Sequence, residues 1–175
     1  MRSAGLVLIG ALLVVAILVI GGLAYVKSTG LRAQAEPGTL ETRVARAFRS
    51  LAVPAEIKER TNPLAKSEDA FWSGLEHYAR YCAPCHANDG RGRKAAFGPG
   101  LYPKPSDLLE THDLTDGELF YIIENGVRFT GMPAFGTGTP SEAGEKLLWQ
   151  LVTFLRRLPK LTSDELGHME ALNAL

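Results

Sequence analysis

The chain has 175 residues, a length that suits one modest domain and a short additional segment. Its 19 acidic and 19 basic residues cancel, so no overall charge favours binding to nucleic acid or to an anionic surface. Only two cysteines occur, and they lie too close together for a framework of structural disulfides. We therefore expect the two thiols to serve a local chemical purpose.

The first element is an uncharged, strongly apolar run over residues 5–26. As a helix that rises ~1.5 Å per residue, this run would span roughly 33 Å, enough to cross a bilayer. A cleaved signal peptide has a shorter apolar core, and the small residues Ala33 and Ala35 lie too far beyond the run to form a good cleavage site. We expect residues 1–26 to form a single transmembrane anchor, with the bilayer around residues 5–26.

Residues 27–66 are expected to link this anchor to the main domain. Between residues 39 and 53, apolar side chains recur at helical spacing: Leu40, Val44, Phe48 and Leu51. Arginines occupy the other faces, and Pro54 ends the pattern, so an amphipathic helix is predicted here. Such a helix could lie on lipid headgroups, pack on a partner subunit, or cover the main domain; the sequence leaves these three possibilities open.

The rest of the chain predicts an all-α domain over residues 67–160 and a C-terminal tail over residues 161–175. Three segments have helical periodicity, and none has the alternating pattern of a strand: 67–82, 115–125 and 141–158. Thr115 and Glu118 have the spacing of a capping box, which marks the start of the second helix. Between the first two helices, residues 87–105 form a long loop rich in Gly and Pro, a length typical of functional loops.

The two cysteines belong to the sequence Cys82-Ala83-Pro84-Cys85-His86. This spacing is that of c-type haem attachment, in which two thiols bond to the haem and the adjacent imidazole binds the iron. A thioredoxin-like dithiol would need a βαβ unit, and a zinc site would need four convergent ligands; neither setting is indicated. We predict one covalently bound haem c, attached through Cys82 and Cys85 and ligated by His86.

The predicted sixth iron ligand is Met132. Its neighbours Gly131 and Pro133 place the thioether in a rigid turn, where a methionine is poorly situated to fill a helical core. The remaining donors are minor alternatives: Met1, Met169, His77, His112 and His168.

Together these residues resemble the class I c-type cytochromes, in particular a bacterial subgroup with the distal loop Thr-Gly-Met-Pro-Ala-Phe-Gly, here residues 130–136. The resemblance covers roughly residues 71–159. It implies a cytochrome c fold in which the first helix of the domain crosses the last. The resemblance assigns Gly74, Tyr78, Leu151 and Phe154 to that crossing.

The same resemblance implies a role for Gly98-Pro99, whose proline carbonyl would accept a hydrogen bond from His86. Pro99 is therefore included among the predicted haem-binding residues. The likeness continues through Asp116-Gly117-Glu118-Leu119 and Asn125-Gly126-Val127-Arg128, which precede the methionine loop.

With both axial positions of the iron filled by protein, electron transfer is favoured over catalysis. We expect an electron carrier, not an enzyme, whose partners are membrane redox complexes or other electron-transfer proteins. Arg91, Arg93 and Lys94 could surround the haem edge or form a solvated cluster. One alternative is a haem subunit of a larger membrane oxidoreductase complex. Another is a ligand-binding sensor or peroxidase, against which the loop 131–136 offers no ionisable residue.

The expected location follows from the resemblance. Bacteria attach haem of this kind on the outer side of the inner membrane. We therefore expect a single-pass protein of the bacterial inner membrane, with its haem domain in the periplasm and a role in a respiratory or photosynthetic chain.

Overall fold

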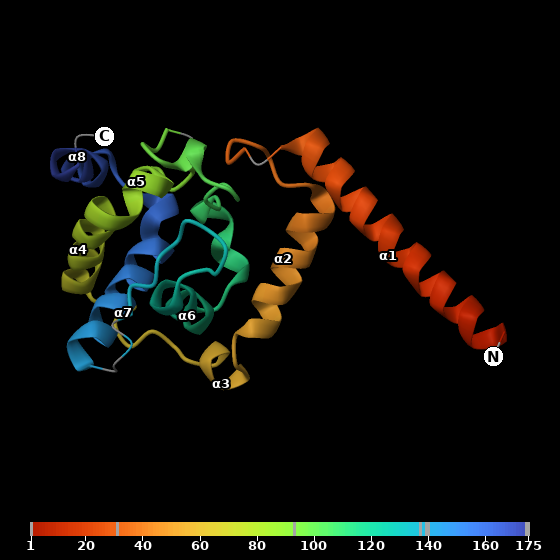
Figure 1. The fold of residues 1–175 in the computed structure, drawn as a ribbon. Coiled ribbons are helices and arrows are strands. Elements are labelled where there is room, and N and C mark those ends of the chain that lie inside the picture. The colour runs from red at the N-terminus through yellow and green to blue at the C-terminus, as the bar shows by residue number, and fades with distance from the viewer. Residues whose placement is uncertain (1, 31, 93, 137, 139–140, 174–175) are drawn as a thin grey trace. The chain divides into compact units, whose positions relative to one another are not determined.

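A computed structural model describes residues 2–30, 32–92, 94–136, 138 and 141–173. Across these residues the regular secondary structure is helical and no strand is present, so the predicted all-α fold is confirmed (Figure 1). The chain divides into two compact units, Met1–Ala35 and Glu36–Leu175, which are described separately.

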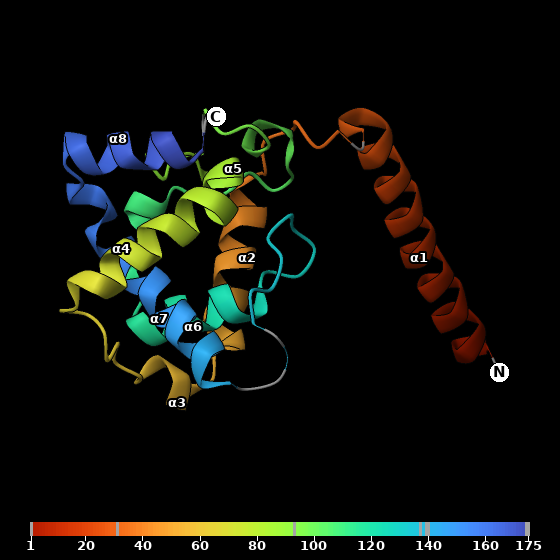
Figure 2. The same ribbon diagram turned by 90° about the vertical axis from the view of Figure 1, so that its left-hand side faces the viewer.

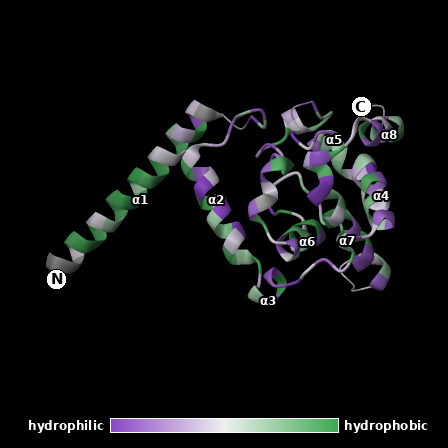
Figure 3. Ribbon diagram, turned by 180° about the vertical axis from the view of Figure 1, so that it is seen from behind, coloured by the Kyte–Doolittle hydropathy of each residue, from purple (hydrophilic) through white to green (hydrophobic). Residues whose placement is uncertain are grey.

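The first unit contains one long helix, α1 (Arg2–Thr29). Its segment Gly5–Ser28 has the length and composition of a membrane span, and its side chains are exposed all around the helix. Figure 3 shows α1 coloured mainly as hydrophobic. An apolar helix without a polar stripe is suited to a lipid environment, which is consistent with the predicted anchor.

The second unit contains seven α-helices among its described residues: α2 (Thr39–Ala52), α3 (Ala55–Lys58), α4 (Glu68–His77), α5 (Ala83–His86), α6 (Asp116–Asn125), α7 (Glu142–Arg157) and α8 (Ser163–Leu172). A π-helical turn, Tyr78–Cys82, joins α4 to α5. Short 3-10 turns cover Gly98–Gly100, Leu108–Asp113 and Leu158–Lys160. The predicted capping box of Thr115 and Glu118 is present at the start of α6.

The centre of the unit is the crossing of α4 and α7, which lie side by side in Figure 2. Gly74 allows the two backbones to meet, because a Cβ atom at this position would lie 2.2 Å from the Gln150 carbonyl oxygen. The aromatic rings of Tyr78 and Phe154 pack beside it in a tilted arrangement, with their centroids 4.8 Å apart. Leu151 is also buried here. The predicted helix crossing is therefore confirmed, with all four of its residues in place.

The C-terminal segment is more structured than the predicted tail. It forms α8, whose Met169 is fully buried in the common core. Beyond the helix, the Asn173 amide donates a hydrogen bond of 2.7 Å to the Ala79 carbonyl oxygen in the π-helical turn. Figure 2 shows α8 near α5. This segment therefore helps to support the turn that carries the cysteines.

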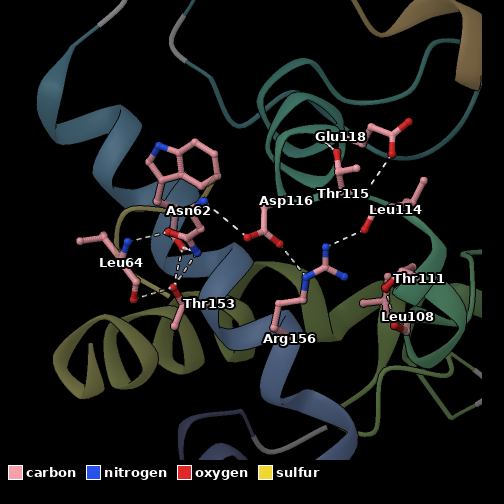
Figure 4. A network of polar contacts seen from close by, with 11 residues as sticks. Asn62, Leu64, Leu108, Thr111, Leu114, Thr115, Asp116, Glu118, Thr153 and Arg156 are labelled. Carbon is pink, nitrogen blue, oxygen red and sulfur yellow. Dashed lines mark hydrogen bonds and ion pairs between the residues drawn. The ribbon is translucent and has the colours of Figure 1, made fainter. Parts of the chain in front are cut away.

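Part of the predicted linker also belongs to the compact unit. The buried Asn62 amide donates hydrogen bonds to the Trp149 carbonyl (3.1 Å) and to Thr153 Oγ1 (2.9 Å) on α7 (Figure 4). The Ile57 carbonyl of α3 lies against α6 so closely that a Cβ atom at Gly117 would be 1.7 Å away. Residues 53–66, predicted as part of the linker, thus pack on α6 and α7.

An ion pair connects α7 to the start of α6. The Arg156 guanidinium lies 2.7 Å from an Asp116 carboxylate oxygen and donates a second hydrogen bond of 2.6 Å to the Leu114 carbonyl (Figure 4). Asp116 also accepts a hydrogen bond from the Asn62 backbone. These contacts fix the start of α6, the helix whose other end leads into the loop that contains Met132.

Acid should weaken the attachment of α8. The Thr162 backbone N–H and hydroxyl and the Arg157 guanidinium hold the pKa of Glu165 below its ordinary value of 4.5. An ionised carboxylate with a lowered pKa stabilises the fold above its unfolded-state pKa, and this contribution disappears as the pH falls through the lowered value. We expect Glu165→Gln to reduce the free energy of unfolding by about 1 kcal/mol at pH 7.

Denaturant melts at pH 7 and in progressively stronger acid would measure this effect. The difference between wild type and Glu165→Gln should shrink as the pH falls below about 4.5, the ordinary value. Glu170→Gln, at an exposed position of the same helix, is the matched control and should change little. A difference for Glu165→Gln that stays constant across the pH range would contradict this account.

Candidate functional site

The Cys-x-x-Cys-His segment lies where the backbone changes from one helical form to another. The predicted continuous helix instead runs as α4, then the π-helical turn Tyr78–Cys82, then α5. Single π-helical turns often occur at functional sites, because they redirect the following side chains. Cys82 and Cys85 are both free thiols and are partly exposed. The turn therefore presents two unpaired sulfurs from one short segment.

The local environment does not resemble that of a redox-active dithiol. Burial, and secondarily the neighbouring Cys85, raises the pKa of the Cys82 thiol to about 12, and burial also raises the pKa of Cys85. Dithiol oxidoreductases depend instead on a lowered thiol pKa. A zinc site has no support either, since the described residues include no group of three or more His, Cys, Asp and Glu side chains suited to a metal ion.

His86 ends α5 with its imidazole fixed by one backbone contact. Its Nδ1 atom lies 3.3 Å from the Ser106 carbonyl oxygen. Because a carbonyl can only accept, the proton of a neutral ring belongs on Nδ1, which leaves the Nε2 lone pair available to a metal. Burial lowers the pKa of His86, with the Ser106 contact opposing this, and so favours the neutral ring that metals bind.

This partner differs from the one expected from the sequence. The Pro99 carbonyl accepts a hydrogen bond from the Lys104 ammonium, while Ser106 takes the position beside His86. The Gly98-Pro99 turn nevertheless lies against the motif, because a Cβ atom at Gly98 would be 2.6 Å from the Cys85 carbonyl oxygen. A direct Pro99–His86 hydrogen bond is therefore absent from this arrangement, and a haem contact for Pro99 stays a prediction.

A buried tyrosine secures the chain just after the motif. The Tyr78 hydroxyl donates a hydrogen bond of 2.8 Å to the Ala87 carbonyl, and Ala87 has a positive φ of 59°. Burial raises the pKa of the Tyr78 phenol, so it keeps its proton and remains a donor. The sequence assigned Tyr78 only to the helix crossing; its second role depends on a backbone turn that the sequence pattern does not predict.

The Met132 loop is tied to the end of α6. The Thr130 hydroxyl donates to the Val127 carbonyl and accepts from the Met132 backbone, and the Val127 N–H donates to the Met132 carbonyl. Gly126 is required at the base of this loop. It has a φ of 65°, and a Cβ atom there would lie 2.7 Å from the Met132 carbonyl. Met132 itself is partly buried against the core.

The other candidate ligands are placed less favourably. Met169 is fully buried in the core, His77 stacks on Tyr81, and His168 lies edge-on to Trp72. Met1 and the side chain of His112 lie outside the part of the chain that the structure describes.

The structure describes two of the three residues of the predicted cationic cluster. Arg91 and Lys94 are exposed, in agreement with either interpretation of their role. Arg93 is outside the described residues.

The donor set fits a haem of the c type. Two unpaired thiols with two residues between them can form thioether bonds. The oriented imidazole has a free Nε2 atom, and a hydrogen-bonded loop carries the Met132 thioether. An all-α fold with these groups defines a c-type cytochrome.

Comparison with protein families agrees. Residues 69–155 match the family model described as cytochrome c oxidase, cbb3-type, subunit III. This segment, which runs from α4 to the end of α7, therefore belongs to that family of c-type cytochromes. Comparisons with curated proteins and with solved structures found no match.

Proposed function

We propose that this chain is a membrane-anchored monohaem cytochrome that transfers electrons between redox partners. Cys82 and Cys85 would hold one haem c covalently, and His86 and Met132 would be its axial ligands. When bound, the haem supplies a reversible one-electron centre. The observation that carries the proposal is the pairing of an oriented imidazole with a methionine loop that is anchored separately to α6.

The protein residues would set the properties of this centre. The Ser106 carbonyl keeps the His86 ring in the tautomer that can bind iron, and such contacts also raise the basicity of the ligand. Hydrogen bonds within residues 127–132 hold Met132 in place. With both axial positions filled, electrons would pass through the haem edge, and Arg91 and Lys94 are candidates for contact with a partner.

The apolar helix α1 and the family support a location for this carrier at a membrane. The candidate span Gly5–Ser28 would hold the protein in the bacterial inner membrane, with the haem domain in the periplasm. Confinement to the membrane raises the effective concentration of partners in the same membrane. The matched family is described as an oxidase subunit, so membership of a larger oxidoreductase complex is the alternative to a free carrier.

The ligand assignment can be tested with two methionine substitutions. We expect Met132→Leu to remove the absorption features of a methionine-ligated ferric haem and to lower the midpoint potential, because the thioether favours the reduced iron. Leucine is close in volume to methionine, so packing should change little. The measurement is an optical redox titration of the full-length protein in detergent.

Met169→Leu is the matched control. It makes the same substitution in the buried core, and its spectrum and potential should equal those of the wild type. A spectrum unchanged by Met132→Leu would remove Met132 as the ligand. Carbon monoxide binding by the reduced wild-type protein would instead favour a ligand-binding sensor or peroxidase.

A further inference from the structure

Helix α2 has two unlike faces, and one of them faces the cytochrome domain. Thr42 and Arg49, seven residues apart, are partly buried on the same side, and Arg49 Nε is buried. Val53, directly after the helix, is buried on that side as well. At the N-terminal end, the Glu41 carboxylate accepts a hydrogen bond of 2.7 Å from the Tyr102 hydroxyl. The burial of Thr42 and Arg49 therefore identifies the covered side of α2, and the Glu41–Tyr102 hydrogen bond holds one flank of the helix.

The opposite face of α2 is apolar and uncovered in the structure. Its four residues have exposed fractions from 45% to 80%: Leu40, Val44, Phe48 and Leu51. Their spacing of three and four residues places them in one stripe, about half a turn away from Thr42 and Arg49. Figure 3 shows hydrophobic and hydrophilic residues both present along the helix. The stripe therefore does not cover the cytochrome domain, one of the three roles considered from the sequence.

The chain itself keeps α2 close to a bilayer. The candidate span ends at Ser28 and α2 begins at Thr39, so the ten residues between them reach at most ~36 Å. Arg43, which is exposed, lies beside the stripe and carries charge that suits anionic headgroups. A short tether, an apolar stripe with Phe and Leu, and a neighbouring arginine are features of a helix that lies in the membrane interface.

We propose that the stripe of Leu40, Val44, Phe48 and Leu51 binds the lipid surface of the membrane in which α1 is anchored. The opposite side of α2 carries the cytochrome domain, so this contact would orient the domain relative to the bilayer. An anchored cytochrome with a fixed orientation presents the same edge to every partner in that membrane. This inference goes beyond the electron-transfer function and does not depend on which partner is used.

The test compares two spin-labelled positions on the same helix. Phe48→Cys places a nitroxide on the stripe, and Ser50→Cys places one about 160° away around the helix, at an exposed position off the stripe. Each full-length, haem-loaded variant is reconstituted at one copy per nanodisc of phosphatidylcholine and phosphatidylglycerol. Power-saturation electron paramagnetic resonance then compares collisions with oxygen, which concentrates in lipid, with collisions with a water-soluble nickel complex. The wild-type chain, treated with the same reagent, gives the background.

If the stripe lies in lipid, the label at position 48 should collide mainly with oxygen and the label at position 50 mainly with the nickel complex. An unchanged haem spectrum would show that both variants are folded. Equal nickel accessibility at the two positions would overturn the proposal. Contact of the stripe with a partner subunit that is absent from the nanodisc would then be the remaining role of those considered from the sequence. Exclusion of both reagents at position 48 would also overturn it, because it would indicate contact with protein.

Discussion

A chain in which Cys82 and Cys85 are both replaced by serine is expected to carry no covalently attached haem. The physical reason is that serine keeps nearly the shape of cysteine but cannot form the thioether bond that a thiol forms. Mass spectrometry of the denatured protein measures the result directly. Wild-type protein should have the mass of the polypeptide plus one haem, and the double variant the mass of the polypeptide alone.

The two single variants test the same prediction even if the double variant does not fold. Cys82→Ser and Cys85→Ser each leave one thiol, so each should retain a fraction of covalently bound haem even if the double variant fails to accumulate. A double variant that still carries haem through denaturation would exclude the two cysteines as the attachment points. Haem lost from the wild type on denaturation would have the same consequence.

Gly74→Ala is expected to cause a large loss of stability through a single added methyl group. The added Cβ atom would lie 2.2 Å from the Gln150 carbonyl oxygen and 2.9 Å from the Phe154 Cβ, so α4 and α7 would have to separate. Overpacking of this kind typically costs about 1–3 kcal/mol and sometimes more. Alanine's preference for the helix offsets only about 1 kcal/mol. Because the clash at Gly74 is with backbone atoms, the cost should reach the upper end of this range or exceed it. We therefore expect a net loss of about 2 kcal/mol or more, measured as a lower midpoint of denaturation.

Gly167→Ala is the matched control for that substitution. Gly167 is inside α8, and a Cβ atom there would have nothing within 4 Å. The same change should therefore leave stability unchanged or raise it by up to about 1 kcal/mol. Equal midpoints for Gly74→Ala and wild type would show that the two helices do not meet as closely as the structure indicates.

The parts of the fold that sequence predicted best depend on local patterns. The capping box at Thr115 and Glu118 is encoded by two residues three apart. The close crossing of α4 and α7 was anticipated because glycine and aromatic residues occur at the spacings typical of the family. The Cys-x-x-Cys-His segment likewise specifies its chemistry within five residues. In these cases little long-range information was needed.

The parts that sequence did not predict depend on contacts between distant segments. Asn62 looked like one polar residue of a linker, yet its amide is buried against α7 through partners 87 and 91 positions away. The sequence predicts only a tail where α8 forms, because Met169, the one fully buried apolar side chain of this helix, does not make an apolar stripe by itself. Nothing local could have revealed either contact.

The candidate site also combines features that local sequence patterns predict with features that depend on contacts between distant segments. The donors at positions 82, 85, 86 and 132 were selected from their residue types and spacing. The backbone partner of His86 was not, because both Pro99 and Ser106 belong to an irregular loop whose path decides which carbonyl faces the ring. The direction of the apolar stripe on α2 also depends on distant contacts, because only the burial of Thr42 and Arg49 shows which side of the helix is covered.

The central claim is that this protein holds a covalent, six-coordinate haem and uses it to carry electrons. Optical spectra of oxidised and dithionite-reduced membranes that contain the full-length protein test it most directly. The spectra are repeated after extraction with acidified acetone and after addition of carbon monoxide. We predict that the haem remains with the polypeptide and that carbon monoxide leaves the reduced spectrum unchanged. Haem that passes into the acetone, or a spectrum that shifts readily with carbon monoxide, would contradict the account.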